Sequence, residues 1–168
     1  MPYRVTFVCT GNICRSPMAE HIFRRHVEDE GLDIEVDSSG TGHWHIGASA
    51  DERTVATLRR AGCRSGHRAR QFEPGWFDRY DLIIALDQGH RRDLRRMAAD
   101  DEARGKIRLL REFDANARDL DVADPYYGRN SAFEEVREQI QAAVPGLLDH
   151  IRRAIKESAP TVSASMEP

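Results

Sequence analysis

The 168-residue sequence has few cysteines, almost no lysine and no long hydrophobic run. Its three cysteines, Cys9, Cys14 and Cys63, are too few for a disulfide-stabilised secreted scaffold of this length, so we expect reduced thiols in a cytoplasm. No segment approaches the ~20 apolar residues that a transmembrane helix needs, and the first residues lack the apolar stretch of a signal peptide. These absences predict a cytoplasmic protein that does not engage a membrane.

The charge of the chain is nearly balanced. It has 25 basic and 28 acidic residues, a net charge of −3, and 40% apolar residues. This composition is typical of a globular protein and disfavours both a disordered chain and a generally basic nucleic-acid binder. Arg91, Arg92, Arg95 and Arg96 fit one exposed face of a helix, where we expect them to be solvated or ion-paired; they would also attract an anionic protein substrate.

Short β-branched and aromatic runs alternate with longer helical patterns along the chain. This alternation is typical of βα units around a parallel sheet. Strands are predicted at 4–8, 34–38, 81–86 and 106–110, and the third is continuously apolar, as a strand buried on both faces would be. We predict a three-layer α/β sandwich with a four-stranded parallel sheet in the order 2-1-3-4 and helices on both faces.

The helices are predicted from their end signals. Ser16 is expected to be the N-cap of the first helix, with Pro17 at its first position and Gly31 at its end. Two further helices are expected at about 51–61 and 88–99.

The last predicted helix is long. Ser131 is its expected cap, and Pro145 inside it should kink it or split it in two. Because the composition does not change along the chain, we expect one domain over 1–156. The remaining 157–168 lack a hydrophobic pattern and are expected to be disordered.

The turn between the first strand and the first helix predicts an anion site. At the carboxyl edge of a parallel sheet, the free N–H groups of such a turn and of the following helix point at a ligand. Gly11 and Asn12 both adopt left-handed backbone angles at low cost, so the turn can curl into a ring of N–H groups. Arg15 closes the ring and offers two donors to an oxyanion. The G-x-x-x-x-G-K-[ST] motif of nucleotide-binding loops is absent.

Cys9 is predicted to lie at the bottom of this ring. The N–H dipoles, the helix N-terminus and Arg15 all favour its thiolate form, which can attack phosphorus, while Ser16 steadies the sulfur with a hydrogen bond. Arg15 and the loop amides neutralise the phosphate oxygens, so we expect neither a metal nor a cofactor. The other residues expected to bind phosphate are Thr10, Gly11, Asn12, Ile13, Cys14 and Ser16.

The segment CTGNICRSP at 9–17 resembles the signature of the low-molecular-weight protein tyrosine phosphatases. The resemblance continues, in the family's order and spacing, through SSGT at 38–41, WHIG at 44–47, HRARQ at 67–71 and DPYYG at 124–128. It implies a flavodoxin-like fold of the phosphotyrosine phosphatase I type. It also implies hydrolysis of phosphotyrosine in proteins through a phosphocysteine, with inorganic phosphate as product and inhibitor.

The resemblance assigns roles to residues outside the loop. Asp124 matches the general acid that protonates the departing phenol and then activates water. Trp44, Tyr126 and Tyr127 match the aromatic walls of a slot that stacks a phenyl ring.

Two residues outside the loop support it in this interpretation, and a second cysteine within it has a possible redox role. His67 resembles a buried histidine that, with Ser38, orients Asn12. Cys14 is close enough to Cys9 in a curled loop to form a reversible disulfide that would protect the nucleophile from over-oxidation.

One segment departs from the family pattern. Many members carry Asn three residues after the Asp that follows the buried strand, whereas this chain has His90 three residues after Asp87. The supporting role of this segment is therefore in doubt, although Asp87 can still cap a helix.

Three other functions remain as alternatives. Arsenate reduction on the same fold needs further cysteines near 80–90, where this chain has none. Protein arginine phosphatases of a related branch carry Thr where this chain has Ile13, whose apolar side chain suits an aromatic ring better. A zinc module built from Cys9, Cys14, His21 and His26 has an unusual spacing, with its two histidines on different sides of a helix.

Overall fold

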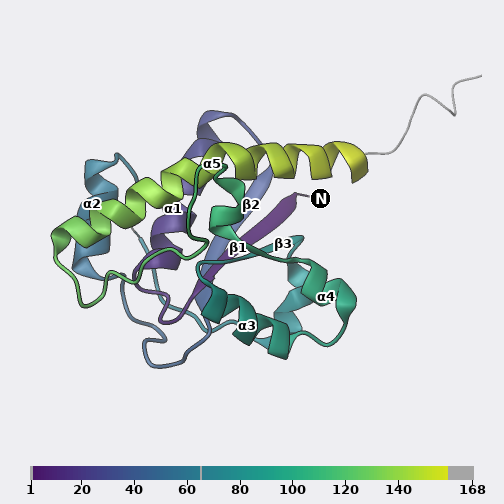
Figure 1. The fold of residues 1–168 in the computed structure, drawn as a ribbon, viewed down its shortest axis with the longest axis horizontal. Coiled ribbons are helices and arrows are strands. Elements are labelled where there is room, and N and C mark those ends of the chain that lie inside the picture. The colour runs from purple at the N-terminus through teal and green to yellow at the C-terminus, as the bar shows by residue number, and fades with distance from the viewer. Residues whose placement is uncertain (1, 65, 159–168) are drawn as a thin grey trace, which may run out of the picture.

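The computed structural model describes residues 2–64 and 66–158 and contains a four-stranded parallel sheet. The strand order β2-β1-β3-β4 confirms the predicted order 2-1-3-4. The strands are β1 (Tyr3–Cys9), β2 (Ile34–Gly40), β3 (Leu82–Ala85) and β4 (Ile107–Leu109). All four point the same way, so their carboxyl ends lie along one edge of the sheet (Figure 1).

Helical segments cover both faces of the sheet, as predicted. The helices are α1 (Arg15–Asp29), α2 (Glu52–Arg60), α3 (Gln88–Met97), α4 (Asp101–Gly105) and α5 (Asn130–Ser158). Two 3₁₀ helices, η1 (Pro74–Arg79) and η2 (Leu110–Phe113), were not predicted, and neither was α4. The short α4 begins at Asp100, whose carboxylate accepts a hydrogen bond from the Ala103 N–H at 2.8 Å.

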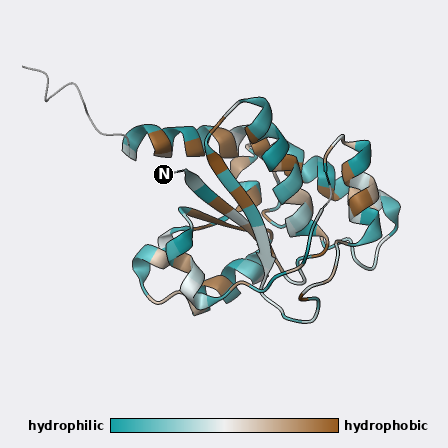
Figure 2. Ribbon diagram, turned by 180° about the vertical axis from the view of Figure 1, so that it is seen from behind, coloured by the Kyte–Doolittle hydropathy of each residue, from teal (hydrophilic) through white to brown (hydrophobic). Residues whose placement is uncertain are grey.

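Alternation along β1 divides the core between the two faces. Val5 and Phe7 belong to the cluster that contains the apolar faces of α1 and α5. Val8 points to the other face and packs in the cluster that includes Leu94 of α3. Figure 2 shows the hydrophobic strands enclosed between these two layers, as a central parallel sheet requires. Within 2–64 and 66–158, no helix is long and apolar enough to cross a membrane.

The first helix begins earlier than predicted. Cys14, not Ser16, is the N-cap of α1, and its carbonyl accepts the Met18 N–H at 3.2 Å. Ser16 is unavailable as a cap because its hydroxyl is engaged by the side chains of Cys9 and Asn12. The predicted end is confirmed: Gly31 follows α1 with a positive φ of 64°.

The last helix is not split at Pro145. The helix α5 runs without interruption from Asn130 to Ser158, past the predicted domain boundary at 156. Val144 and Leu147, on either side of the proline, are both buried, so packing against the sheet stabilises the turn that lacks one N–H donor. The predicted tail is therefore helical at Glu157 and Ser158, and 159–168 lie outside the described residues.

The packing of α5 on η2 predicts a test of this fold. A Cβ atom added at Gly146 would collide with the backbone of Phe113, so Gly146→Ala should lower the free energy of unfolding by about 1–2 kcal/mol in spite of the higher helix propensity of alanine. Urea unfolding followed by circular dichroism measures the change. Gly105→Ala, which meets open space at the end of α4, is the control and should not destabilise. If Gly146→Ala were as stable as Gly105→Ala, η2 would be able to shift without a cost in free energy, which would contradict the prediction.

Candidate active site

The 9–16 loop joins the carboxyl end of β1 to the start of α1 and curls around a left-handed turn. Asn12 has φ = 56° and is the one non-glycine residue of the described chain with a positive φ. Of the two residues that can adopt left-handed angles at low cost, Gly11 does not do so. The lack of a side chain at Gly11 instead leaves room for His45, whose ring would lie 2.8 Å from an added Cβ.

The strained turn is held by hydrogen bonds on every side of Asn12. Its Nδ2 donates to Ser16 Oγ at 2.8 Å and to Ser38 Oγ at 2.9 Å. Its Oδ1 accepts the Arg70 N–H at 2.9 Å, and its backbone oxygen lies 2.7 Å from His67 Nε2. The structure thus brings both sequence-predicted support residues, Ser38 and His67, into contact with Asn12.

Two cysteines of the loop lie in different chemical environments. Cys9 is buried at the end of β1, and its Sγ is 2.9 Å from Ser16 Oγ. Burial raises the pKa of the Cys14 thiol to about 12, and the charges of Asp51 and Cys9 add to the effect. Cys14 is therefore a protonated thiol at neutral pH. Of the two, Cys9 is the candidate nucleophile, and all three cysteines of the chain are unbonded.

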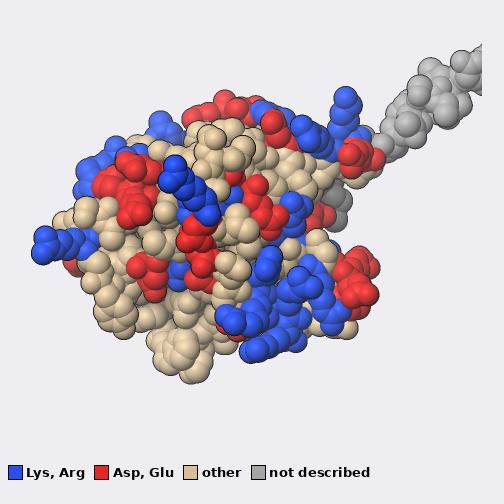
Figure 3. Space-filling view, viewed as in Figure 1, with Lys and Arg blue, Asp and Glu red and all other residues tan. Residues whose placement is uncertain are grey.

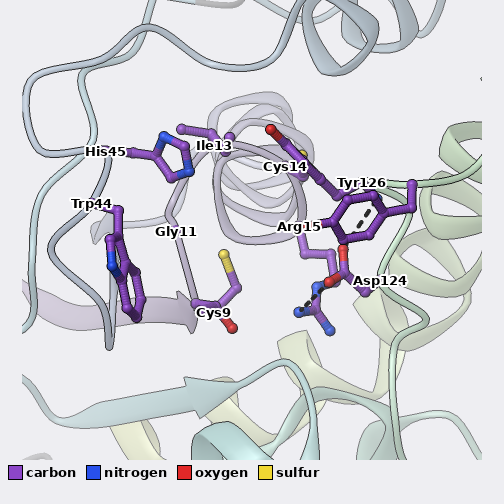
Figure 4. Close-up of a pocket in the computed structure, with 11 residues that line it drawn as sticks. Cys9, Gly11, Ile13, Cys14, Arg15, Trp44, His45, Asp124 and Tyr126 are labelled. Carbon is purple, nitrogen blue, oxygen red and sulfur yellow. Dashed lines mark hydrogen bonds and ion pairs between the residues drawn. The ribbon is translucent and has the colours of Figure 1, made fainter.

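Arg15 is a buried guanidinium with a fixed orientation. Its Nη1 donates to Asp87 Oδ2 and to the Val122 carbonyl, both at 2.9 Å. Its Nη2 lies 3.8 Å from Asp124 Oδ2 and lines the pocket above Cys9 (Figure 4). Because Nη1 is bound to Asp87 and Val122, Nη2 is directed into the pocket, where it can bind an anion.

Asp87 links the loop to α3, which settles the doubt raised by the sequence. Its Oδ1 accepts the His90 N–H at 2.8 Å, so it caps α3 as expected, while its Oδ2 binds Arg15. The bound Arg15 contributes to holding the pKa of the Asp87 carboxyl below its usual value, against the effect of burial.

His90 also contacts the loop, a role that the sequence did not indicate. Its Nε2 lies 2.8 Å from Thr10 Oγ1 and 3.4 Å from Arg15 Nη2, so it touches both ends of the loop. Its Nδ1 is 3.1 Å from Asp87 Oδ1 but is not aligned as a hydrogen bond. Burial, followed by the charge of Arg15, lowers the pKa of His90 to about 4. A neutral imidazole can accept hydrogen bonds from Thr10 and Arg15 at once.

The pocket over Cys9 is a slot of about 230 Å³. Its floor is formed by loop residues between Cys9 and Arg15, and its rim brings together the predicted residues Trp44, Asp124 and Tyr126 (Figure 4). The predicted Tyr127 also lines the slot, whereas Asn12 and Ser16 of the loop are buried and do not line it. Three rim side chains are largely solvent-accessible: Trp44 is 71% exposed, Tyr127 94% and Asp124 57%, as the walls of an empty slot would be. His45 is a further lining residue that sequence reasoning missed.

Arg53 of α2 positions the rim segment 124–128. Its guanidinium donates to the carbonyls of Tyr126 at 2.9 Å and Gly128 at 3.0 Å, and it lies over the Phe133 ring at 4.4 Å. Asp51 also holds this guanidinium, because its Oδ2 lies 3.0 Å from Arg53 Nη2. No motif in the sequence pointed to Arg53, because its partners are backbone carbonyls more than 70 positions away.

The described residues do not gather the four ligands of the alternative zinc site. Their one cluster of possible ligands combines Glu20, His21 and His67, without the loop cysteines. The Glu20 carboxylate in it already accepts hydrogen bonds from Ser38 and from Arg24, both at 2.6 Å. A metal would have to displace these partners, so the structure does not support this alternative.

Comparison with known proteins identifies the family. Residues 4–158 match the family "Low molecular weight phosphotyrosine protein phosphatase". The chain is 53% identical to a low molecular weight protein-tyrosine-phosphatase of Streptomyces coelicolor, with 95% of this chain and 99% of the relative covered. It is 44% identical to low molecular weight protein-tyrosine phosphatase A of Mycobacterium tuberculosis, covering 95% and 98%. The crystal structure of YfkJ from Bacillus subtilis superposes with a TM-score of 0.86 at 41% identity, covering 95% and 98%. The chain therefore belongs to this family of phosphatase enzymes.

The depressed pKa of His90 predicts a pH-dependent stability. The unfolded state, with an ordinary histidine pKa of 6.5, binds more protons than the folded state between about pH 6.5 and pH 4. The free energy of unfolding should therefore fall as the pH drops through this window, and His90 should contribute up to about 3 kcal/mol of that fall. His90→Asn should show a correspondingly shallower pH dependence.

Urea unfolding of both proteins at pH 7, 5.5 and 4 measures this difference. His43→Asn, at an exposed histidine, is the matched control and should follow the wild-type curve. Parallel curves for the wild type and His90→Asn would contradict the burial of a neutral imidazole.

Proposed function

We propose that the protein hydrolyses phosphotyrosine in proteins through a phosphocysteine intermediate on Cys9. One arrangement carries this proposal: a buried cysteine lies 2.9 Å from a serine hydroxyl, and an arginine and an aspartate meet over it in one slot. In this proposal the amides of the 9–16 loop and the Nη2 of Arg15 bind the three non-bridging phosphate oxygens.

In the first step, the Cys9 sulfur attacks phosphorus and the bond from phosphorus to the phenolic oxygen breaks. Asp124 gives its proton to the departing oxygen, so tyrosine leaves as a neutral phenol. The Ser16 hydroxyl, 2.9 Å from the sulfur, would donate a hydrogen bond that stabilises the thiolate. In the second step, Asp124 takes a proton from water, the water oxygen attacks phosphorus, and the bond from sulfur to phosphorus breaks. Inorganic phosphate leaves and the thiolate is restored.

The slot favours an aryl phosphate. Trp44, Tyr126 and Tyr127 present aromatic surface around the entrance, and Ile13 adds an apolar side chain to the lining. A phenyl ring stacks on such walls, whereas the short side chain of phosphoserine leaves them uncovered. We expect free phosphate to occupy the loop as product and to inhibit competitively.

A thiolate nucleophile requires a reducing compartment, and the unbonded cysteines fit the cytoplasm as the place of action. Both Cys9 and Cys14 line the slot, which supports a reversible disulfide under oxidation. The high pKa of Cys14 makes it a poor attacking thiol at neutral pH, so such a bridge would form slowly.

The general acid is tested by the dependence of rate on the leaving group. Asp124→Ala should reduce kcat/KM, which reports the steps up to cleavage of the bond to the phenolic oxygen, by about 10²- to 10⁴-fold for aryl phosphates with a poor leaving group and much less for those with a good one, since only a basic oxygen needs the proton. Steady-state kinetics on a series of substituted phenyl phosphates measures the slope. Cys9→Ser should lose activity on the whole series. A uniform loss in Asp124→Ala, or full activity in Cys9→Ser, would overturn the assignment.

Ile13 is tested as a determinant of substrate choice. Replacing it with threonine adds a hydroxyl that can contact a phosphoguanidinium and removes apolar contact with a phenyl ring. Ile13→Thr should shift the ratio of kcat/KM for phosphoarginine over phosphotyrosine peptides upward by about tenfold. The wild type should prefer phosphotyrosine over both phosphoarginine and phosphoserine. A wild-type preference for phosphoarginine would replace the proposed substrate.

A further inference from the structure

The exposed side of α3 carries four arginines without an ion-pair partner. Arg92, Arg95 and Arg96 are exposed and Arg91 is half-buried. None of the ion pairs found within 2–64 and 66–158 involves these four residues. Other arginines without an ion-pair partner, such as Arg59 and Arg118, are well separated from one another in the sequence, whereas α3 carries four within six positions. These four residues are called the α3 arginine patch. The sequence predicted that these arginines would be either solvated or ion-paired, and the structure shows them solvated.

The α3 arginine patch does not serve the helix itself. Arg91 with Arg95, and Arg92 with Arg96, are like-charged pairs four residues apart, a spacing that destabilises a helix. Only Arg95 and Arg96 lie in the last turn, where the helix dipole favours a positive charge. The concentration of charge is therefore retained at a cost to α3, in a chain whose net charge is −3.

The patch forms one continuous basic surface. Its four arginines, together with Gln88, Gly89 and Asp121, line a shallow hollow. Figure 3 shows a group of basic side chains on the α3 side of the molecule. Acidic residues of α4, such as Asp101, lie beyond the C-terminal end of α3. A ligand with several negative charges therefore matches the surface of α3 but not the surface beyond it.

Two contacts connect this hollow to the slot. Asp121, which lines the hollow, accepts the Gln88 N–H at 2.8 Å and precedes Asp124 by three residues. Asp87, at the start of α3, binds Arg15 at 2.9 Å. Arg91 follows Asp87 by four residues, which is about 6 Å along the helix axis. A polypeptide that leaves the slot past Asp124 would thus cross directly onto the arginines.

We propose that the α3 arginine patch docks an acidic segment of the phosphotyrosine-bearing substrate protein. This inference rests on the proposed function, because the phosphotyrosine in the slot places the segment. From Arg91 to Arg96 the helix rises about 8 Å, a span that two or three residues of extended chain cover. The substrate accordingly carries two or three carboxylates a few residues from its phosphotyrosine.

Nucleic acid fits the hollow less well than an acidic polypeptide. No aromatic side chain lines it for base stacking. An acidic peptide tethered through the slot needs only a few exposed ion pairs, each of which adds a modest amount to affinity. The patch therefore acts on substrate choice and encounter rate more than on tight binding.

Phosphotyrosine peptides with matched flanks test the proposal. One peptide carries three glutamates beginning three residues before the phosphotyrosine, and a second peptide carries three glutamates beginning three residues after it. Each has a partner peptide with glutamine at the same positions. The wild type should prefer at least one glutamate peptide by about five- to tenfold in kcat/KM, mainly through KM, and 0.5 M salt should remove most of the preference. The double variant Arg92→Gln, Arg96→Gln should reduce it to within about twofold. A small aryl phosphate, which ends at the slot, should be hydrolysed equally well by both proteins.

The double variant Arg153→Gln, Lys156→Gln on α5 removes the same charge from another surface and should retain the preference. A preference that is absent in the wild type, or that persists when the patch is neutralised, would overturn the proposal. Single-stranded DNA and the unphosphorylated glutamate peptide are also compared as inhibitors of the wild type. Stronger inhibition by the DNA that is lost in the Arg92→Gln, Arg96→Gln variant would reassign the surface to nucleic acid. Failure of the proposed function is distinct, because the wild type would then hydrolyse neither the peptides nor the aryl phosphate.

Discussion

The geometry of the site depends on the left-handed backbone of Asn12. A single residue at φ = 56° reverses the chain between β1 and α1, so that the Cys9 sulfur lies 2.9 Å from the Ser16 hydroxyl. An asparagine in this conformation costs free energy unless its polar atoms are satisfied. Ser16, Ser38, Arg70 and His67 together satisfy them, and they come from three separate parts of the chain. The support of the loop is thus distributed over the fold and cannot arise from the loop alone.

Segments that follow β3 and η2 also contribute to the site, because they orient Arg15. The loop determines where its Cα lies, but Asp87 and the Val122 carbonyl determine where its guanidinium points. Both partners follow the carboxyl edge of the sheet, beyond β3 and beyond η2, and the parallel arrangement brings them to the end of β1. His90 then joins Thr10 to Arg15, so that both ends of the loop contact α3. The helix α3 is accordingly part of the site.

The residues that sequence reasoning found are those with a local signature. The loop, Asp124 and the apolar β3 are recognisable from consecutive residues, and the parallel α/β class follows from the alternation of strands and helices. The residues that it missed act over distance. Nothing near His90 or Arg53 in the sequence announces a contact with residues some 70 to 80 positions away. Pro145 was misjudged for a related reason, since local propensity predicts a break that tertiary packing overrides.

The rigidity of α3 connects these observations. Its N-cap is Asp87, where a negative charge suits the helix N-terminus, and its last turn carries Arg95 and Arg96, where positive charge suits the C-terminus. Leu94, buried against β3 and β4, fixes the helix to the sheet between these ends. The arginines and Asp87, which binds Arg15, therefore stand on one short helix. A substrate segment that binds this helix contacts an element that already orients the phosphate-binding guanidinium, so recognition and chemistry share a single support.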